Sequence, residues 1–193
     1  MLFLLPLLSL LTPSLAQSFS GPGTIAVWNS SDWRVATPND KVGCLSATGR
    51  FIPTSSSSTC GTFTPLPTYP YTLSSTQGNC TFRDKSQEQN TESHYGGGDY
   101  AFYCSKETVA EVYDGLYTID GMSYPFLCNG DINCYYDAKR VPAQGQTSSL
   151  WPFRWGSQQI GITPGHVMLQ LVWEGAGKVG KRGAMEFKGE ARD

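Results

Sequence analysis

Apolar and polar residues alternate along much of the C-terminal half of this chain. The run 166–173 carries an apolar side chain at every second position: Val167, Leu169, Leu171 and Trp173. A period of two places all four on one face of a β-strand. The run 150–155 shows the same period, at Trp151, Phe153 and Trp155. We therefore expect the two runs to pair as a hairpin with a shared apolar face.

Shorter strands are predicted upstream, where β-branched and aromatic residues cluster between turn residues. These runs are 24–28, 44–45, 50–52, 80–82 and 100–104. Gly49 supplies the turn between the second and third of them, which predicts a hairpin. The segment 105–114 fits a short helix and a strand equally well, because Val109, Val112 and Tyr113 share helical spacing.

Turn signals complete the pattern. Asp120-Gly121 lies between two β-rich runs and favours a type I′ hairpin turn. The segment 83–99 is polar and ends in three glycines, which predicts a mobile loop. Many short strands with few helices indicate a mainly β protein, built as an antiparallel β-sandwich or barrel with at most one short helix.

The N-terminus carries the pattern of an export signal. Residues 1–16 are almost entirely apolar and end in Ser14-Leu15-Ala16, a small-x-small site of the kind that signal peptidase cleaves. No Lys or Arg precedes the apolar run, so the α-amino group of Met1 supplies the positive end. A membrane anchor needs about 20 apolar residues, and this run is shorter and is broken by two prolines. We expect a cleaved signal and a secreted, extracellular protein without a later membrane span.

After the signal, the pattern predicts one secreted domain over 17–173 and a flexible tail over 174–193. The tail interleaves glycines with lysines and arginines and has little apolar area to bury. Charged residues make up 16% of the chain, against roughly a quarter in average globular proteins. A net charge of −2 gives no electrostatic reason to expect nucleic acid or an anionic membrane as a partner.

All six cysteines follow the signal: Cys44, Cys60, Cys80, Cys104, Cys128 and Cys134. An even number after an export signal predicts three disulfides formed in an oxidising compartment. Cys128–Cys134 is the favoured local pair because 129–133 can turn, and the pairing of the other four stays open. There is no Cys-x-x-Cys motif and the chain has only 2 histidines. We therefore expect no metal site and no cofactor.

Two N-glycosylation sequons occur, at Asn29 and Asn79, and each predicts a solvent-facing position in a glycoprotein. At Asn79, formation of a disulfide by the adjacent Cys80 competes with glycan attachment.

Residues able to carry catalysis are few. His94 and His166 could act as a general acid and base, but their spacing does not link them, so a solvated loop histidine and a strand-end histidine are favoured. Asp131 and Glu174 are the carboxylates to consider for glycoside hydrolysis. Motifs of the common serine hydrolases and zinc proteases do not occur in the sequence. The chain is therefore expected to be a non-enzyme.

Aromatic residues are the remaining lead, since exposed tryptophan and tyrosine faces stack on sugar rings. Trp28 and Trp33 flank the first sequon and are the candidates for glycan contact, although burial in a β core is favoured for the tryptophans as a set.

In its composition and general sequence features, the chain resembles the small secreted cysteine-containing proteins of filamentous fungi. The resemblance rests on the export signal, the six cysteines, the two sequons and stretches such as Cys60-Gly61-Thr62-Phe63-Thr64-Pro65-Leu66-Pro67. It implies a protein that works outside the cell, as effectors and elicitors do. The expected function is non-catalytic action of the folded surface on an extracellular host protein or a cell-wall polysaccharide. A hydrolase of polysaccharide or RNA and a carbohydrate-binding module are the alternatives.

Overall fold

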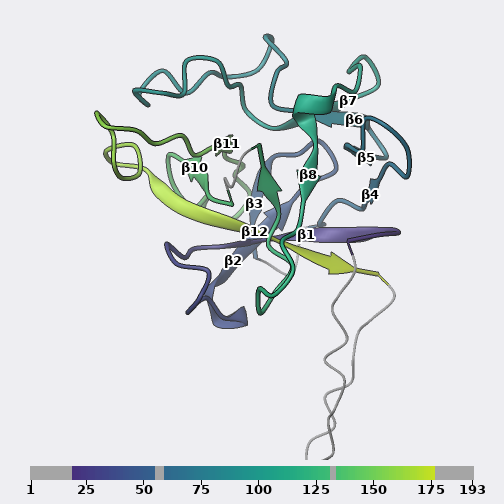
Figure 1. The fold of residues 1–193 in the computed structure, drawn as a ribbon, viewed down its shortest axis with the longest axis horizontal. Helices are drawn as coiled ribbons and strands as arrows, with labels where there is room; N and C mark the ends of the chain where they lie inside the picture. Colours follow the sequence, from purple (N-terminus) through teal and green to yellow (C-terminus); the bar gives the residue numbers. More distant parts are fainter. Residues whose placement is uncertain (1–18, 55–58, 131–133, 177–193) are drawn as a thin grey trace, which may run out of the picture.

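The computed structural model describes residues 19–54, 59–130 and 134–176. Within these ranges the chain is mainly antiparallel β-structure, as predicted, with one curled sheet and a small two-stranded sheet (Figure 1). The strands are β1 (Gly23–Trp28), β2 (Lys41–Leu45), β3 (Phe51–Pro53), β4 (Phe63–Pro65), β5 (Leu73–Ser75), β6 (Gly78–Thr81), β7 (Tyr103–Ser105), β8 (Leu116–Tyr117), β9 (Cys128–Asn129), β10 (Tyr136–Ala138), β11 (Trp151–Pro152) and β12 (Val167–Gly175). Two 3-10 turns accompany them, η1 (Pro38–Asp40) and η2 (Val112–Asp114).

Strands β1 and β12 form the centre of the curled sheet and are buried on both faces. They pair antiparallel from Gly23 opposite Gly175 to Trp28 opposite Gln170. Odd-numbered side chains of both strands enter the main core, and even-numbered ones such as Trp28 and Val172 enter a smaller cluster on the other face. The predicted alternation over 166–173 is therefore confirmed.

The sheet curls until its two ends meet. The order of strands runs β11-β10-β12-β1-β4-β5-β6-β7, with β2 and β3 attached to β1. Phe102, just before β7, donates its backbone N–H to the carbonyl of Leu150, just before β11, at 2.8 Å. This contact brings the two ends of the order together, so the main core lies enclosed by the sheet.

The predicted hairpin between 150–155 and 166–173 is wrong. Strand β10 lies between β11 and β12 and pairs with both. Trp151 and Phe153 are buried as expected, but Trp155 is 71% exposed, because β11 ends at Pro152 and the chain turns away. A shared period of two shows that two runs are strands, and it does not show that they are neighbours.

Three further expectations change in detail. The segment 105–114 is neither helix nor strand along most of its length, with only Ser105 in β7 and Val112–Asp114 in η2. Gly121 adopts a positive φ of 88°, as the turn prediction requires, yet β8 pairs with β9 across the longer connection 118–127. Glu174 and Gly175 belong to β12 rather than to the tail. By contrast, the β2–β3 hairpin is confirmed, with Gly49 at φ 85°.

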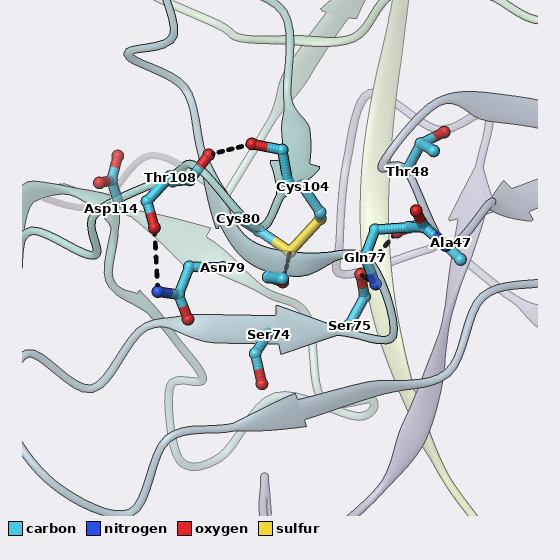
Figure 2. The surroundings of a disulfide bond; sticks show 12 residues. Ala47, Thr48, Ser74, Ser75, Gln77, Asn79, Cys80, Cys104, Thr108 and Asp114 are labelled. Carbon is cyan, nitrogen blue, oxygen red and sulfur yellow. Dashed lines mark hydrogen bonds between the residues drawn. A yellow bond between two sulfur atoms is a disulfide. The ribbon is translucent and has the colours of Figure 1, made fainter.

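Three disulfides join the six cysteines: Cys44–Cys60, Cys80–Cys104 and Cys128–Cys134. The predicted local pair is confirmed. The second disulfide joins directly paired residues of β6 and β7 (Figure 2).

Two predicted segments, the signal over 1–16 and nearly all of the tail, lie outside the described residues. Among the helices that the structure describes, none has the length and apolar character needed to cross a membrane.

Candidate functional site: an aromatic groove

Four exposed apolar or aromatic side chains gather around one hollow, which we call the tyrosine groove. They are Tyr71, Val112, Tyr113 and Tyr117, with exposed fractions from 37% to 68%. The groove has a volume of about 630 Å³ and is formed by the turn before β5, by η2 and by β8 and β9. In Figure 1, η2 is the short coil above β8. The other lining residues are Pro70, Arg83, Gly115, Leu116, Asn129, Gly130 and Arg154.

Tyr113 is presented by η2, and the neighbouring Asp114 holds η2 in place. The buried Asp114 carboxylate accepts hydrogen bonds from the Thr81 hydroxyl at 2.6 Å, the Phe82 N–H at 3.4 Å and the Glu111 N–H at 3.3 Å. Burial raises the pKa of Asp114, and the three hydrogen bonds offset part of that rise. Asp114 ties η2 to β6, so η2 is held in place without burial of the adjacent Tyr113 ring. That ring is 68% exposed.

Tyr71 has an unusual backbone conformation, with φ at 58°. A bulky residue in this left-handed region costs about 1–3 kcal/mol, and such strain clusters at functional sites. The side chain of Tyr71 is 61% exposed, so burial of its ring does not offset the cost. A strained residue with an exposed ring is typical of a binding site and not of a core.

Hydrogen bonds fix the floor of the groove. Asn129 is 3% exposed, and its side-chain amide donates to the carbonyl oxygens of Tyr113 and Gly115 at 3.4 and 3.3 Å. The hydroxyl of Tyr117 donates to the Gly130 carbonyl at 2.6 Å. Because these bonds tie η2 and β8 to β9, the walls are organised before any ligand binds, which lowers the ordering cost of binding.

Two arginines bring positive charge to the groove. The Arg83 guanidinium lies 4.7 Å from the centroid of the Tyr113 ring, within the range of a cation–π contact. Arg154 donates to both carboxylate oxygens of Asp99, at 2.8 and 3.1 Å, and to Asn129 Oδ1 at 3.4 Å. Hydrogen bonding to Asp99 raises the pKa of Arg154, so its charge is retained.

The described lining of the groove offers aromatic rings and guanidinium donors, which are suited to binding. None of its described lining residues is a carboxylic acid, a histidine, a serine, a threonine or a cysteine. Nucleophilic and general acid–base catalysis draw mainly on these residue types. Across the described ranges, no cluster of three or more His, Cys, Asp or Glu residues is placed to hold a metal ion.

The sequence carries one signal for this site, in the segment 105–114. Val109, Val112 and Tyr113 share helical spacing, and the segment was predicted to be either a short helix or a strand. In the structure the three side chains are 79%, 48% and 68% exposed. Apolar side chains in a segment that forms neither a regular helix nor a strand are therefore the sequence signal for this exposed surface.

His166 belongs to a different site, the Asp137 cluster, which we define as Asn90, Asp137, Thr163 and His166. The Asp137 carboxylate is 1% exposed and accepts hydrogen bonds from His166 Nδ1, from the Thr163 hydroxyl and, at 3.0 Å, from Asn90 Nδ2. On the other side of the imidazole, Nε2 lies 3.4 Å from a Glu92 carboxylate oxygen. The cluster connects the loop 83–99 with β10 and with the start of β12.

An imidazole aligned by a buried carboxylate is the arrangement used in general acid–base catalysis. Here, however, the His166 side chain is 3% exposed, its ring stacks on Trp151 and its Nε2 is shielded from solvent. A catalytic base must reach the proton that it takes from the substrate. The geometry therefore supports a structural role for His166.

The other catalytic candidates have surroundings of their own. His94 is exposed and its ring lies against Tyr95. Glu174 forms an ion pair with Lys41 at 2.8 Å across the sheet. Asp131 lies outside the described residues. The described contacts thus give His94 and Glu174 partners that do not include His166.

Trp28 does not provide a surface for glycan contact. It is 3% exposed and packs edge-to-face on Tyr124 and Phe126. Trp33 is partly buried against the same cluster. The physical reason is that β1 is covered on both faces, so the ring on the face away from the main core is also buried.

The two sequons differ in their surroundings. Asn29 is exposed just after β1. Asn79 is partly buried in β6, and its side-chain nitrogen donates to the Thr108 carbonyl at 3.1 Å, as Figure 2 shows. A glycan attaches to this same nitrogen, so glycosylation at Asn79 must fit into partly buried surroundings beside the Thr108 carbonyl. Occupancy of both sites stays a prediction.

No known protein family, curated protein or solved structure was found to match this chain. The fold and the site together define the class: a mainly antiparallel β protein, stapled by three disulfides, with a preorganised aromatic groove on its surface.

Proposed function

We propose that this protein is a non-catalytic extracellular binding protein, and that the tyrosine groove binds a cell-wall polysaccharide. One observation carries the proposal: 4 of the 9 large apolar side chains that are exposed among the described residues line a single groove. Exposed apolar residues scattered singly need no explanation, whereas a contiguous patch marks an interaction site. Action of this kind on a wall is the role expected of an effector- or elicitor-like secreted protein.

The shape of the groove favours a glycan over a flat protein surface. A volume of about 630 Å³ falls within the range of about 300–1,000 Å³ typical of ligand sites. Tyrosine rings offer an apolar face for the pyranose ring and a hydroxyl at the edge, and the groove adds arginine donors for sugar hydroxyls. Three disulfides support the extracellular part of the proposal, because they persist in oxidising compartments.

The test incubates the oxidised, full-length secreted protein with a panel of insoluble cell-wall polysaccharides. Depletion of the protein from solution and release of soluble sugar are both measured. We expect depletion by at least one polysaccharide without sugar release, and about thirtyfold weaker binding for Tyr113→Ala, since truncating an anchor residue costs on the order of 2 kcal/mol.

The matched control is Trp155→Ala, which removes an equally exposed aromatic ring outside the groove. It should bind as the wild type does. A second variant, Tyr71→Gly, removes another groove ring while keeping the positive φ, and should also weaken binding. Equal binding by Tyr113→Ala and wild type overturns the groove as the site, and sugar release by the pure protein overturns the non-catalytic proposal.

A further inference from the structure

The charges around the tyrosine groove are one-sided. Arg83 and Arg154 both line it, and its described lining contains no aspartate or glutamate. Arg154 is paired with Asp99, whereas the contacts described for the Arg83 guanidinium give it the Tyr113 ring and no carboxylate at ion-pair distance. Arg83 is exposed. The Arg83 charge also lowers the pKa of the Asp114 carboxyl, against the larger effect of burial. An exposed planar guanidinium held beside an aromatic ring is a donor pair for an anionic group.

The net charge elsewhere on the protein differs in sign from the charges that line the groove. The chain as a whole carries a net charge of −2. A second hollow of about 440 Å³, which Arg83 also lines, has four carboxyl side chains and one lysine in its described lining: Asp84, Glu107, Glu111, Asp114 and Lys85. Carboxyl groups outnumber cations in that hollow, whereas the described lining of the groove has two arginines and no carboxyl group. The described groove therefore complements the charge of an acidic ligand better than the neighbouring hollow does.

We infer that the polysaccharide bound by the groove is acidic, with uronate carboxylates that the Arg83 guanidinium holds in a bidentate contact while tyrosine rings stack on the sugars. This inference rests on the proposed function and narrows its ligand class. The groove supplies each part of the recognition. The Tyr71 ring and the face of the Tyr113 ring that Arg83 does not cover can stack on sugars, and the Arg83 guanidinium, 4.7 Å from the Tyr113 ring centroid, supplies the charge.

Calorimetric titration of the oxidised full-length protein tests the inference with one matched pair of ligands. The first is an oligogalacturonate, and the second is its methyl ester, which keeps the sugar rings and removes the negative charges. We expect the acid form to bind about tenfold more tightly, because a hydrogen bond to a charged group is worth about 1.5 kcal/mol or more. Raising the salt concentration should weaken binding of the acid form and leave the ester unchanged.

Variants separate charge at the groove from charge elsewhere. Arg83→Gln should abolish the preference for the acid form, and Lys106→Gln, which removes an exposed positive charge outside the groove lining, should retain it. Thermal unfolding of each variant confirms that the fold persists.

The outcomes distinguish this inference from the proposed function. Equal affinity for the acid and the ester, or an unchanged preference in Arg83→Gln, overturns the acidic ligand. If Tyr113→Ala still weakens binding of the ester in that case, the groove remains a glycan site. Absence of binding to every glycan tested overturns both.

Discussion

The Asp137 cluster yields a sharp prediction about stability. Asp137→Ala removes the acceptor for three buried or half-buried donors, namely His166 Nδ1, the Thr163 hydroxyl and Asn90 Nδ2. Each donor left unpaired in a buried site costs about 1–3 kcal/mol. We therefore expect the free energy of unfolding to fall by about 4 kcal/mol, a large fraction of the stability of an ordinary domain.

Urea unfolding, followed by tryptophan fluorescence, measures this loss. The matched control is Asp84→Ala, which removes a carboxylate that accepts hydrogen bonds from Ser86 and Gln87 within a surface turn. Water can replace those bonds, so the control should lose about 1 kcal/mol or less. A loss for Asp137→Ala that matches the control would refute the argument that burial makes this acceptor indispensable. His166→Ala combined with Asp137→Ala should cost less than the sum of the two, because the residues share one interaction.

Two further predictions concern the disulfides and Asp114. Replacing both cysteines of Cys80–Cys104, with a sequence separation of 24, should lower the free energy of unfolding by about 3.5 kcal/mol. For Cys128–Cys134, with a separation of 6, the loss should be about 2.4 kcal/mol, because closing the longer loop costs the unfolded chain more entropy. The reverse order of the two losses in urea unfolding contradicts this. Burial raises the pKa of Asp114 above its ordinary 3.8, so its stabilising contribution is complete below that value and is lost as the pH rises through the folded pKa. The stability of the wild type relative to Asp114→Asn should therefore fall as the pH rises from below 3.8 through the folded pKa of Asp114, and a constant difference would count against the buried carboxyl.

Local signals predicted the elements well where the chain is buried on one or both sides. The alternation at Leu169, Leu171 and Trp173 identified β12, and Gly49 identified the β2–β3 turn. Cys128 and Cys134 were paired correctly because a disulfide across so short a segment depends only on local turning. These features share one property: their energies are decided among residues close in sequence.

The candidate site was predicted less well, and single residues show why. Tyr113 and Trp28 are both aromatic and both follow apolar neighbours, yet one is 68% exposed and the other 3%. Their exposure depends on segments distant in sequence: Asp114 ties η2 to Thr81, while Phe126 covers Trp28. The sequence contains no local pattern that distinguishes the two cases.

By itself, the sequence determined the mainly β character, the positions of the principal strands and the disulfide that closes a short turn. Backbone geometry imposes the period of two on any strand with a buried face, so these features can be read along the chain. Only the tertiary structure decided that β10 lies between β11 and β12, that Asp137 and His166 share a hydrogen bond, and that tyrosines from three segments surround one groove. Each of these depends on contacts between residues far apart in sequence, whose free energies are set by the packing of the whole sheet.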